Sequence, residues 1–240
     1  MAKAFSKVGT VAARFIKGAM VAVVIPLAIG LILGMLDQLE LLHMDGASAR
    51  QWMLWGFTTY VGLHIILYRP VGLFRASHRV FSTIAVWLFG GQVASVESAK
   101  GSGGKSGGKG VKGEGAAQGS TLVAFSPYVI PSFTVLVCAA AWVAGRWVEP
   151  SRLEAPLCFF AGLTLAFHWL MTADELQQQR ERWHIETYLL AVGLIIVLTV
   201  LLAAAALPLG LPEFSFARAL ADGLAKTQAI YASLIHELFL

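Results

Sequence analysis

The chain has 240 residues, 57% of them hydrophobic and 13% charged, with a formal net charge of +4 and a mean hydropathy of +0.70. Soluble domains carry roughly 25% charged residues, so the composition excludes an ordinary soluble domain. It predicts an all-α polytopic membrane protein, with about five transmembrane helices, a short re-entrant helix and a C-terminal amphipathic helix.

Residues 1–17 are basic, and the apolar run Gly18–Leu36 follows them. A cleaved signal peptide is the alternative for such a start. The run is longer than the apolar core of a typical signal peptide, and the acidic residues after it make a poor cleavage context. We therefore expect a basic cytoplasmic N-terminus and a retained first span.

Residues 18–91 are expected to hold two spans and a shorter membrane segment. Trp52–Tyr68 is long enough to cross a bilayer, whereas Val80–Phe89 is not. The latter fits a re-entrant helix, which a membrane tolerates where protein covers the backbone. Most of the eighteen lysines and arginines then lie on the N-terminal side. This bias predicts a bacterial inner (cytoplasmic) membrane protein with its N-terminus in the cytoplasm and its C-terminus outside.

A degenerate metal-binding pattern begins at His78. In the zinc-hydrolase motif H-E-x-x-H, two histidines one helical turn apart hold the metal, and the glutamate acts as general base. Here Arg79 stands in place of the base and Ser82 in place of the second histidine. A guanidinium cannot accept a proton, and serine is a poor zinc ligand. We therefore expect no catalytic residue in this stretch.

The stretch continues with Gly90-Gly91-x-Val93, then Pro127-Tyr128-x-x-Pro131, and later Gly162–His168. This order resembles the site-2-protease-type intramembrane zinc metallopeptidases, over roughly residues 64–205. The resemblance implies a membrane-embedded fold with an internal groove and zinc-dependent peptidase activity. The replacements at Arg79 and Ser82 imply that the activity has been lost.

Residues 92–120 form a loop rich in glycine and lysine, a composition that favours a linker. Gly103-Gly104-Lys105-Ser106 lacks the first glycine of a phosphate-binding loop and has no preceding strand, so we expect no nucleotide, and no nucleic acid either. Four lysines are predicted to contact the anionic membrane surface or a protein partner: Lys100, Lys105, Lys109 and Lys112.

Residues 121–211 are expected to form three further spans: Thr121–Gly145, Pro156–Met171 and Thr187–Leu211. Several tryptophans fall near span ends, where the indole favours the membrane interface: Trp52, Trp55, Trp147 and Trp169.

Three histidines lie in or near the predicted spans, where ionisable groups often mark a function. His64, His78 and His168 could reach a similar depth on the cytoplasmic side and form a metal site, because neutral imidazoles suit zinc, copper or iron. His64 and His168 also follow small residues that could leave room for a haem or chlorophyll-type macrocycle. The alternative is three interfacial histidines with ordinary hydrogen bonds, and no cofactor is our primary expectation.

Residues 212–240 form a tail with an apolar stripe of helical period, interrupted at Thr227 and Gln228. Such a helix rests on a membrane surface or packs against a partner. The stripe comprises Phe216, Leu220, Leu224, Tyr231, Leu234 and Leu238.

The sequence therefore predicts a non-catalytic, metalloprotease-like membrane protein, which serves as a structural or accessory subunit of a larger assembly. We expect other integral membrane proteins and lipids as its partners. Two alternatives remain open. One is a cofactor-binding protein that uses the intramembrane histidines, and the other is a divergent active peptidase.

Overall fold

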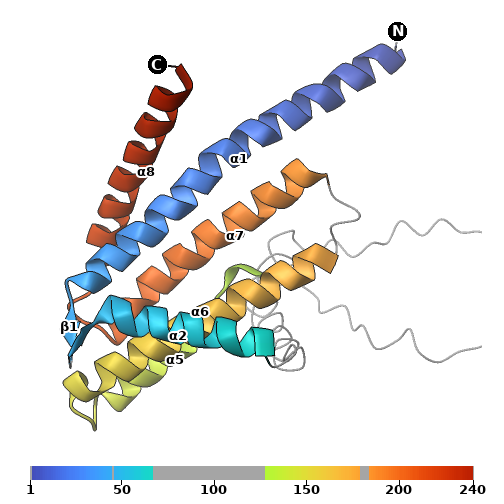
Figure 1. Cartoon of the computed structure of the whole chain (residues 1–240). Helices are drawn as coiled ribbons and strands as arrows, with labels where there is room; N and C mark the ends of the chain where they lie inside the picture. Colours follow the sequence, from blue (N-terminus) through green and yellow to red (C-terminus); the bar gives the residue numbers. More distant parts are fainter. Residues whose placement is uncertain (1, 45, 67–127, 179–183, 240) are drawn as a thin grey trace, which may run out of the picture. The chain divides into compact units, whose positions relative to one another are not determined.

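The computed structural model describes residues 2–44, 46–66, 128–178 and 184–239. These residues contain six α-helices and one short hairpin (Figure 1), which confirms the predicted all-α fold. The predicted re-entrant helix and the lysine loop lie outside the described residues. The helices are α1 (Ala2–Glu40), α2 (Ala49–Ile66), α5 (Ser132–Ala144), α6 (Pro150–Gln178), α7 (Ile185–Ala206) and α8 (Phe216–Phe239). Strands β1 (His43–Met44) and β2 (Ala47–Ser48) form the hairpin, and the 3₁₀ turn η3 (Leu207–Leu209) follows α7.

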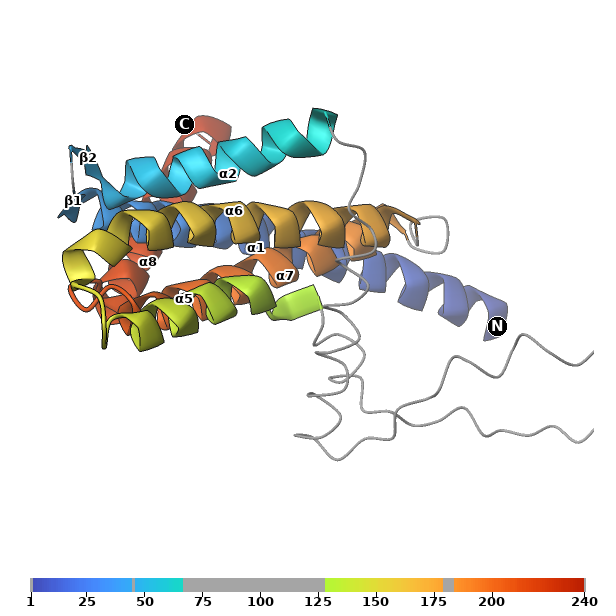
Figure 2. The ribbon, with the colours of Figure 1, turned by 90° about the horizontal axis from the view of Figure 1, so that it is seen from below.

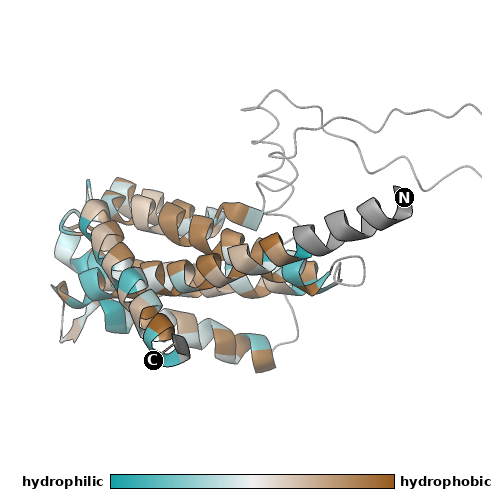
Figure 3. Cartoon of the chain, turned by 90° about the horizontal axis from the view of Figure 1, so that it is seen from above, coloured by the Kyte–Doolittle hydropathy of each residue, from teal (hydrophilic) through white to brown (hydrophobic). Residues whose placement is uncertain are grey.

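Three described helices are long and apolar enough to cross a membrane: Arg14–Glu40 of α1, Pro150–Gln177 of α6, and Ile185–Leu209, which covers α7 and η3. Apolar residues run along these helices, and hydrophilic residues gather at the end opposite the N-terminus (Figure 3). The predicted span Thr121–Gly145 is described only from residue 128, and within it α5 begins at Ser132, directly after Pro131. A proline cannot donate a hydrogen bond within a helix, so it favours a helix start.

α1 and α6 each pack against two other helices. α1 lies between α7, which runs parallel to it, and α8, which runs antiparallel to it. α6 packs on α2, which is parallel, and on α5, which is antiparallel (Figure 2). α6 and α7 are consecutive, yet they meet at few positions.

Two helix pairs approach so closely that a side chain at the crossing would not fit. A Cβ atom added to Gly34 would lie 2.5 Å from the Ala219 carbonyl oxygen, and one on Gly30 would lie 2.7 Å from the Gly223 carbonyl oxygen. In the α2–α6 pair, a Cβ atom on Gly162 would lie 2.8 Å from the Met53 carbonyl carbon. Small residues allow such backbone contact between membrane helices, where packing is a main source of stability.

The tail differs from its prediction. α8 packs along α1 of the same chain, and its buried face consists of the small residues Ala219, Gly223 and Thr227. Two residues of the predicted stripe, Leu224 and Leu234, lie off this buried face and are 50% and 44% exposed. Two helix backbones can approach closely only where the residues between them are small. A stripe drawn from the sequence is instead defined by large apolar residues.

Polar contacts hold α8 to both ends of the α1 segment that it covers. The Lys226 ammonium lies 2.7 Å from the Asp37 carboxylate, and Gln38 donates a hydrogen bond to Asp222 at 2.8 Å. Farther along, the Tyr231 hydroxyl donates a hydrogen bond to the Val23 carbonyl. α8 therefore follows α1 for most of the apolar length of that helix.

Candidate functional site

Only two of the predicted site residues are described. His64 lies near the end of α2, and His168 lies in α6. The degenerate zinc-motif positions His78, Arg79 and Ser82 fall outside the described residues. So do the four predicted contact lysines, Lys100, Lys105, Lys109 and Lys112.

Aromatic rings connect the surroundings of the two histidines. The Tyr60 ring in α2 lies 5.8 Å from the His64 ring and 5.4 Å from the Phe167 ring in α6, measured between centroids. Phe167 directly precedes His168, which is only 5% exposed. α2 and α6 are parallel, so both histidines flank one aromatic contact on two neighbouring helices.

The His64 side of this cluster leaves polar atoms without partners. Within the described part of the chain, neither His64 Nδ1 nor the Tyr60 hydroxyl has a hydrogen-bond partner, although both atoms are buried. A buried polar atom without a partner costs about 1–3 kcal/mol. The pair can therefore donate to or bind a group from outside these residues.

The described residues do not form a metal centre by themselves. Across residues 2–44, 46–66, 128–178 and 184–239, no three histidine, cysteine, aspartate or glutamate side chains could hold one ion together. The predicted three-histidine site therefore depends on His78 and stays a prediction. Gly162 is one of the small residues that precede His168, and the space beside it is filled by the Met53 backbone of α2, which leaves no room there for a macrocycle.

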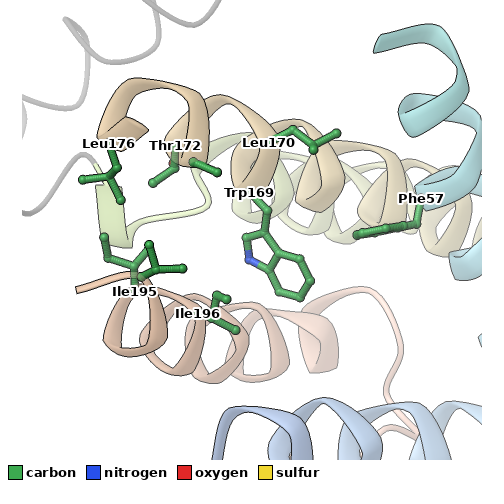
Figure 4. A pocket seen from close by; sticks show the side chains of 9 residues that line it. Phe57, Trp169, Leu170, Thr172, Leu176, Ile195 and Ile196 are labelled. Carbon is green, nitrogen blue, oxygen red and sulfur yellow. The ribbon is translucent and has the colours of Figure 1, made fainter. Parts of the chain in front are cut away.

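Sequence reasoning missed a cavity of about 220 Å³ between α6 and α7. Trp169 and Thr172 contribute to its walls (Figure 4), but the surface that lines the cavity is apolar. The atoms Trp169 Nε1 and Thr172 Oγ1 are buried, and neither has a hydrogen-bond partner among the described residues. Trp169 was expected at the membrane interface for its indole, but the indole nitrogen is buried. A threonine in an apolar helix gave no signal in the sequence.

Comparison of the chain with protein-family models, with curated proteins and with solved structures finds no match.

Proposed function

We propose that this chain is a non-catalytic, metalloprotease-like integral membrane protein that acts as a structural or accessory subunit of a larger membrane assembly. One observation carries the proposal: Arg79 and Ser82 replace the base and the second ligand of the zinc motif that begins at His78. The residues of this motif do not fit zinc. The fixed charge of Arg79 opposes a dication, and His78 is the one histidine left in the motif.

The arrangement of the helices supports a structural role. The backbones of α1 and α8 are in direct contact at glycines, and so are those of α2 and α6. We infer about five apolar spans, of which α1, α6 and α7 with η3 supply the three that are long enough in the described residues, with α8 beside α1. The lysines of the 92–120 loop would supply a basic contact with anionic lipids or an acidic partner surface.

The test begins with the complete chain, extracted from its membrane in mild detergent. We expect one or more membrane proteins to co-purify at a fixed ratio, and we expect no zinc by elemental analysis. A matched variant carries Gln at Lys100, Lys105, Lys109 and Lys112, and it should lose partner or membrane-surface contact while the helices still fold. A chain that purifies alone as a stable monomer would count against the subunit role.

The same preparation tests the alternative of an active peptidase. The double variant Arg79→Glu with Ser82→His restores the H-E-x-x-H spacing and should gain zinc affinity over the wild type. Equal zinc content in both proteins, together with cleavage of a membrane substrate by the wild type, would overturn the proposal.

A second candidate function is cofactor binding through His64 and His168. It is favoured by the buried Nδ1 atom of His64, which has no partner within the described residues. A visible absorption band in the purified protein, lost in His64→Ala but retained in the exposed control His43→Ala, would support it. A colourless and metal-free protein would remove it.

A further inference from the structure

Helix α8 presents a second face besides the one that packs on α1. The α1-facing surface consists of the small residues Ala219, Gly223 and Thr227. On the second face, Leu224 and Ile235 are 50% and 58% exposed. We call this face the outer seam, and its four exposed residues are Ala221, Leu224, Gln228 and Ile235.

The spacing of the outer seam is typical of helices that pair side by side. Leu224 follows Ala221 by three residues, Gln228 follows Leu224 by four, and Ile235 comes one heptad after Gln228. A repeat of three and four residues keeps one line of side chains toward a neighbouring helix. A polar residue within such a line fixes the register and the number of helices that associate.

The polar residue of the seam lies deep along the apolar length of α1. Thr227, directly before Gln228, packs against Gly30, and Tyr231, three residues later, donates a hydrogen bond to the Val23 carbonyl. The apolar stretch of α1 runs from Arg14 to Glu40, so about 20 Å of helix lie on either side of this level. Within the described ranges the Gln228 amide has no hydrogen-bond partner, and an unpaired amide in hydrocarbon is costly.

The exposed face of α7 shows the contrast with a surface that suits lipid. Its exposed residues at the same depth are large and apolar, and they recur every four residues: Leu194, Leu198 and Leu202. The outer seam has Gln228 at its centre instead. Because glutamine side chains hydrogen-bond across membrane helices, the outer seam suits another helix better than it suits acyl chains.

The chemistry of the seam selects a second copy of this chain. Two copies insert in the membrane with the same orientation, so a twofold axis between them runs along the membrane normal and pairs like helices in parallel. Gln228 then faces the partner's Gln228 at the same depth. A carboxamide has both an acceptor oxygen and donor hydrogens, so each side chain can donate to the other. The seam carries no charged residue, so this pairing brings no like charges together along it.

We propose that the outer seam is the contact surface between two copies of this chain, which pair in parallel through α8 with reciprocal Gln228 hydrogen bonds at the centre. Gly30 and Gly34 of α1 stay covered by the α8 helix of their own chain. The pairing requires α1 to cross the membrane but needs no other protein. It can therefore hold or fail independently of the subunit role proposed above.

Disulfide cross-linking of the complete chain in its native membrane tests the pairing. Leu224→Cys and Ile235→Cys place thiols on the seam, and Ala229→Cys is the control at an exposed position of α8 off the seam. After oxidation with copper phenanthroline, both seam variants should form a dimer of twice the chain mass. The control and the wild type, whose two cysteines are buried, should not. No dimer from the seam variants, equal dimer from the control, or a product with the mass of a different protein would overturn the proposal.

A second pair of variants tests the amide itself. Gln228→Leu removes the amide and keeps a side chain of similar size, and Gln51→Leu is the matched change on the exposed face of α2. Energy transfer between donor-labelled and acceptor-labelled chains in lipid vesicles, measured at increasing dilution, gives the association constant. We expect about fivefold weaker association for Gln228→Leu and no change for Gln51→Leu. Equal association of the two variants would show that Gln228 does not meet its counterpart, and the proposal would fall.

Discussion

Single glycines set the distance between the helices of this chain. Gly34 meets the α8 backbone so closely that an added Cβ atom would lie 2.5 Å from the Ala219 carbonyl oxygen. Real Cβ atoms essentially never come within 3.0 Å of a heavy atom outside their own stretch of chain. The helices would have to separate to admit even one methyl group.

We therefore predict that Gly34→Ala destabilises the protein by about 1–3 kcal/mol, the usual cost of overpacking. Gly18→Ala is the matched control in the same helix, because no described atom lies within 4 Å of its Cβ position. The control should be neutral, or more stable by up to about 1 kcal/mol, since alanine favours helix over glycine. The midpoint of unfolding in mixed detergent and SDS measures both. Equal midpoints for the two variants would show that α8 does not pack at Gly34.

At the scale of an element, α8 covers a surface of α1 that could pair with another helix. Gly30 and Gly34 form a small-xxx-small pattern, the kind of surface through which membrane helices dimerise. In this chain Ala219, Gly223 and Thr227 of α8 occupy it. α8 thus acts as an internal partner for α1.

We predict that a chain ending after Ser215 forms a dimer through α1, whereas the complete chain does not use this surface for association. Chemical cross-linking and light scattering in detergent measure the change. Adding Gly30→Leu to the shortened chain should return it to a monomer, while Gly18→Leu should leave the dimer intact. A shortened chain that stays monomeric would contradict the prediction.

The sequence predicted the elements better than their contacts. The apolar runs of α1, α6 and α7 were evident, because a span needs about 20 apolar residues whatever surrounds it. The close packing at Gly34 and Gly162 was not predicted, because the sequence does not distinguish them from a glycine such as Gly62, whose Cβ position has no described atom within 4 Å. His64 and His168 were singled out by residue type alone. The cavity at Thr172 was missed because it depends on the distance between α6 and α7.

At the scale of the whole molecule, the contacts of α8 change the predicted topology. The sequence placed the C-terminus on the side opposite the N-terminus, with the tail on the surface. In the structure, α8 starts beside Asp37 and reaches Val23 at Tyr231, so it runs back along the span that α1 provides. The turn between α5 and α6 lies at the hairpin end of the helices, opposite the N-terminus (Figure 2). Glu149 is the residue just before α6.

We therefore predict that both termini lie on one side of the membrane and that Glu149 lies on the other. This path places the charged Lys226 near the apolar layer. The cost is limited because Lys226 pairs with Asp37 at 2.7 Å, and because a long basic side chain can reach toward the interface. Green fluorescent protein should fluoresce when fused after Leu240, and alkaline phosphatase inserted after Glu149 should be active. Active phosphatase after Leu240, with no fluorescence there, would place the tail on the Glu149 side. The contacts between α8 and the middle of α1 would then be incompatible with a membrane-spanning α1.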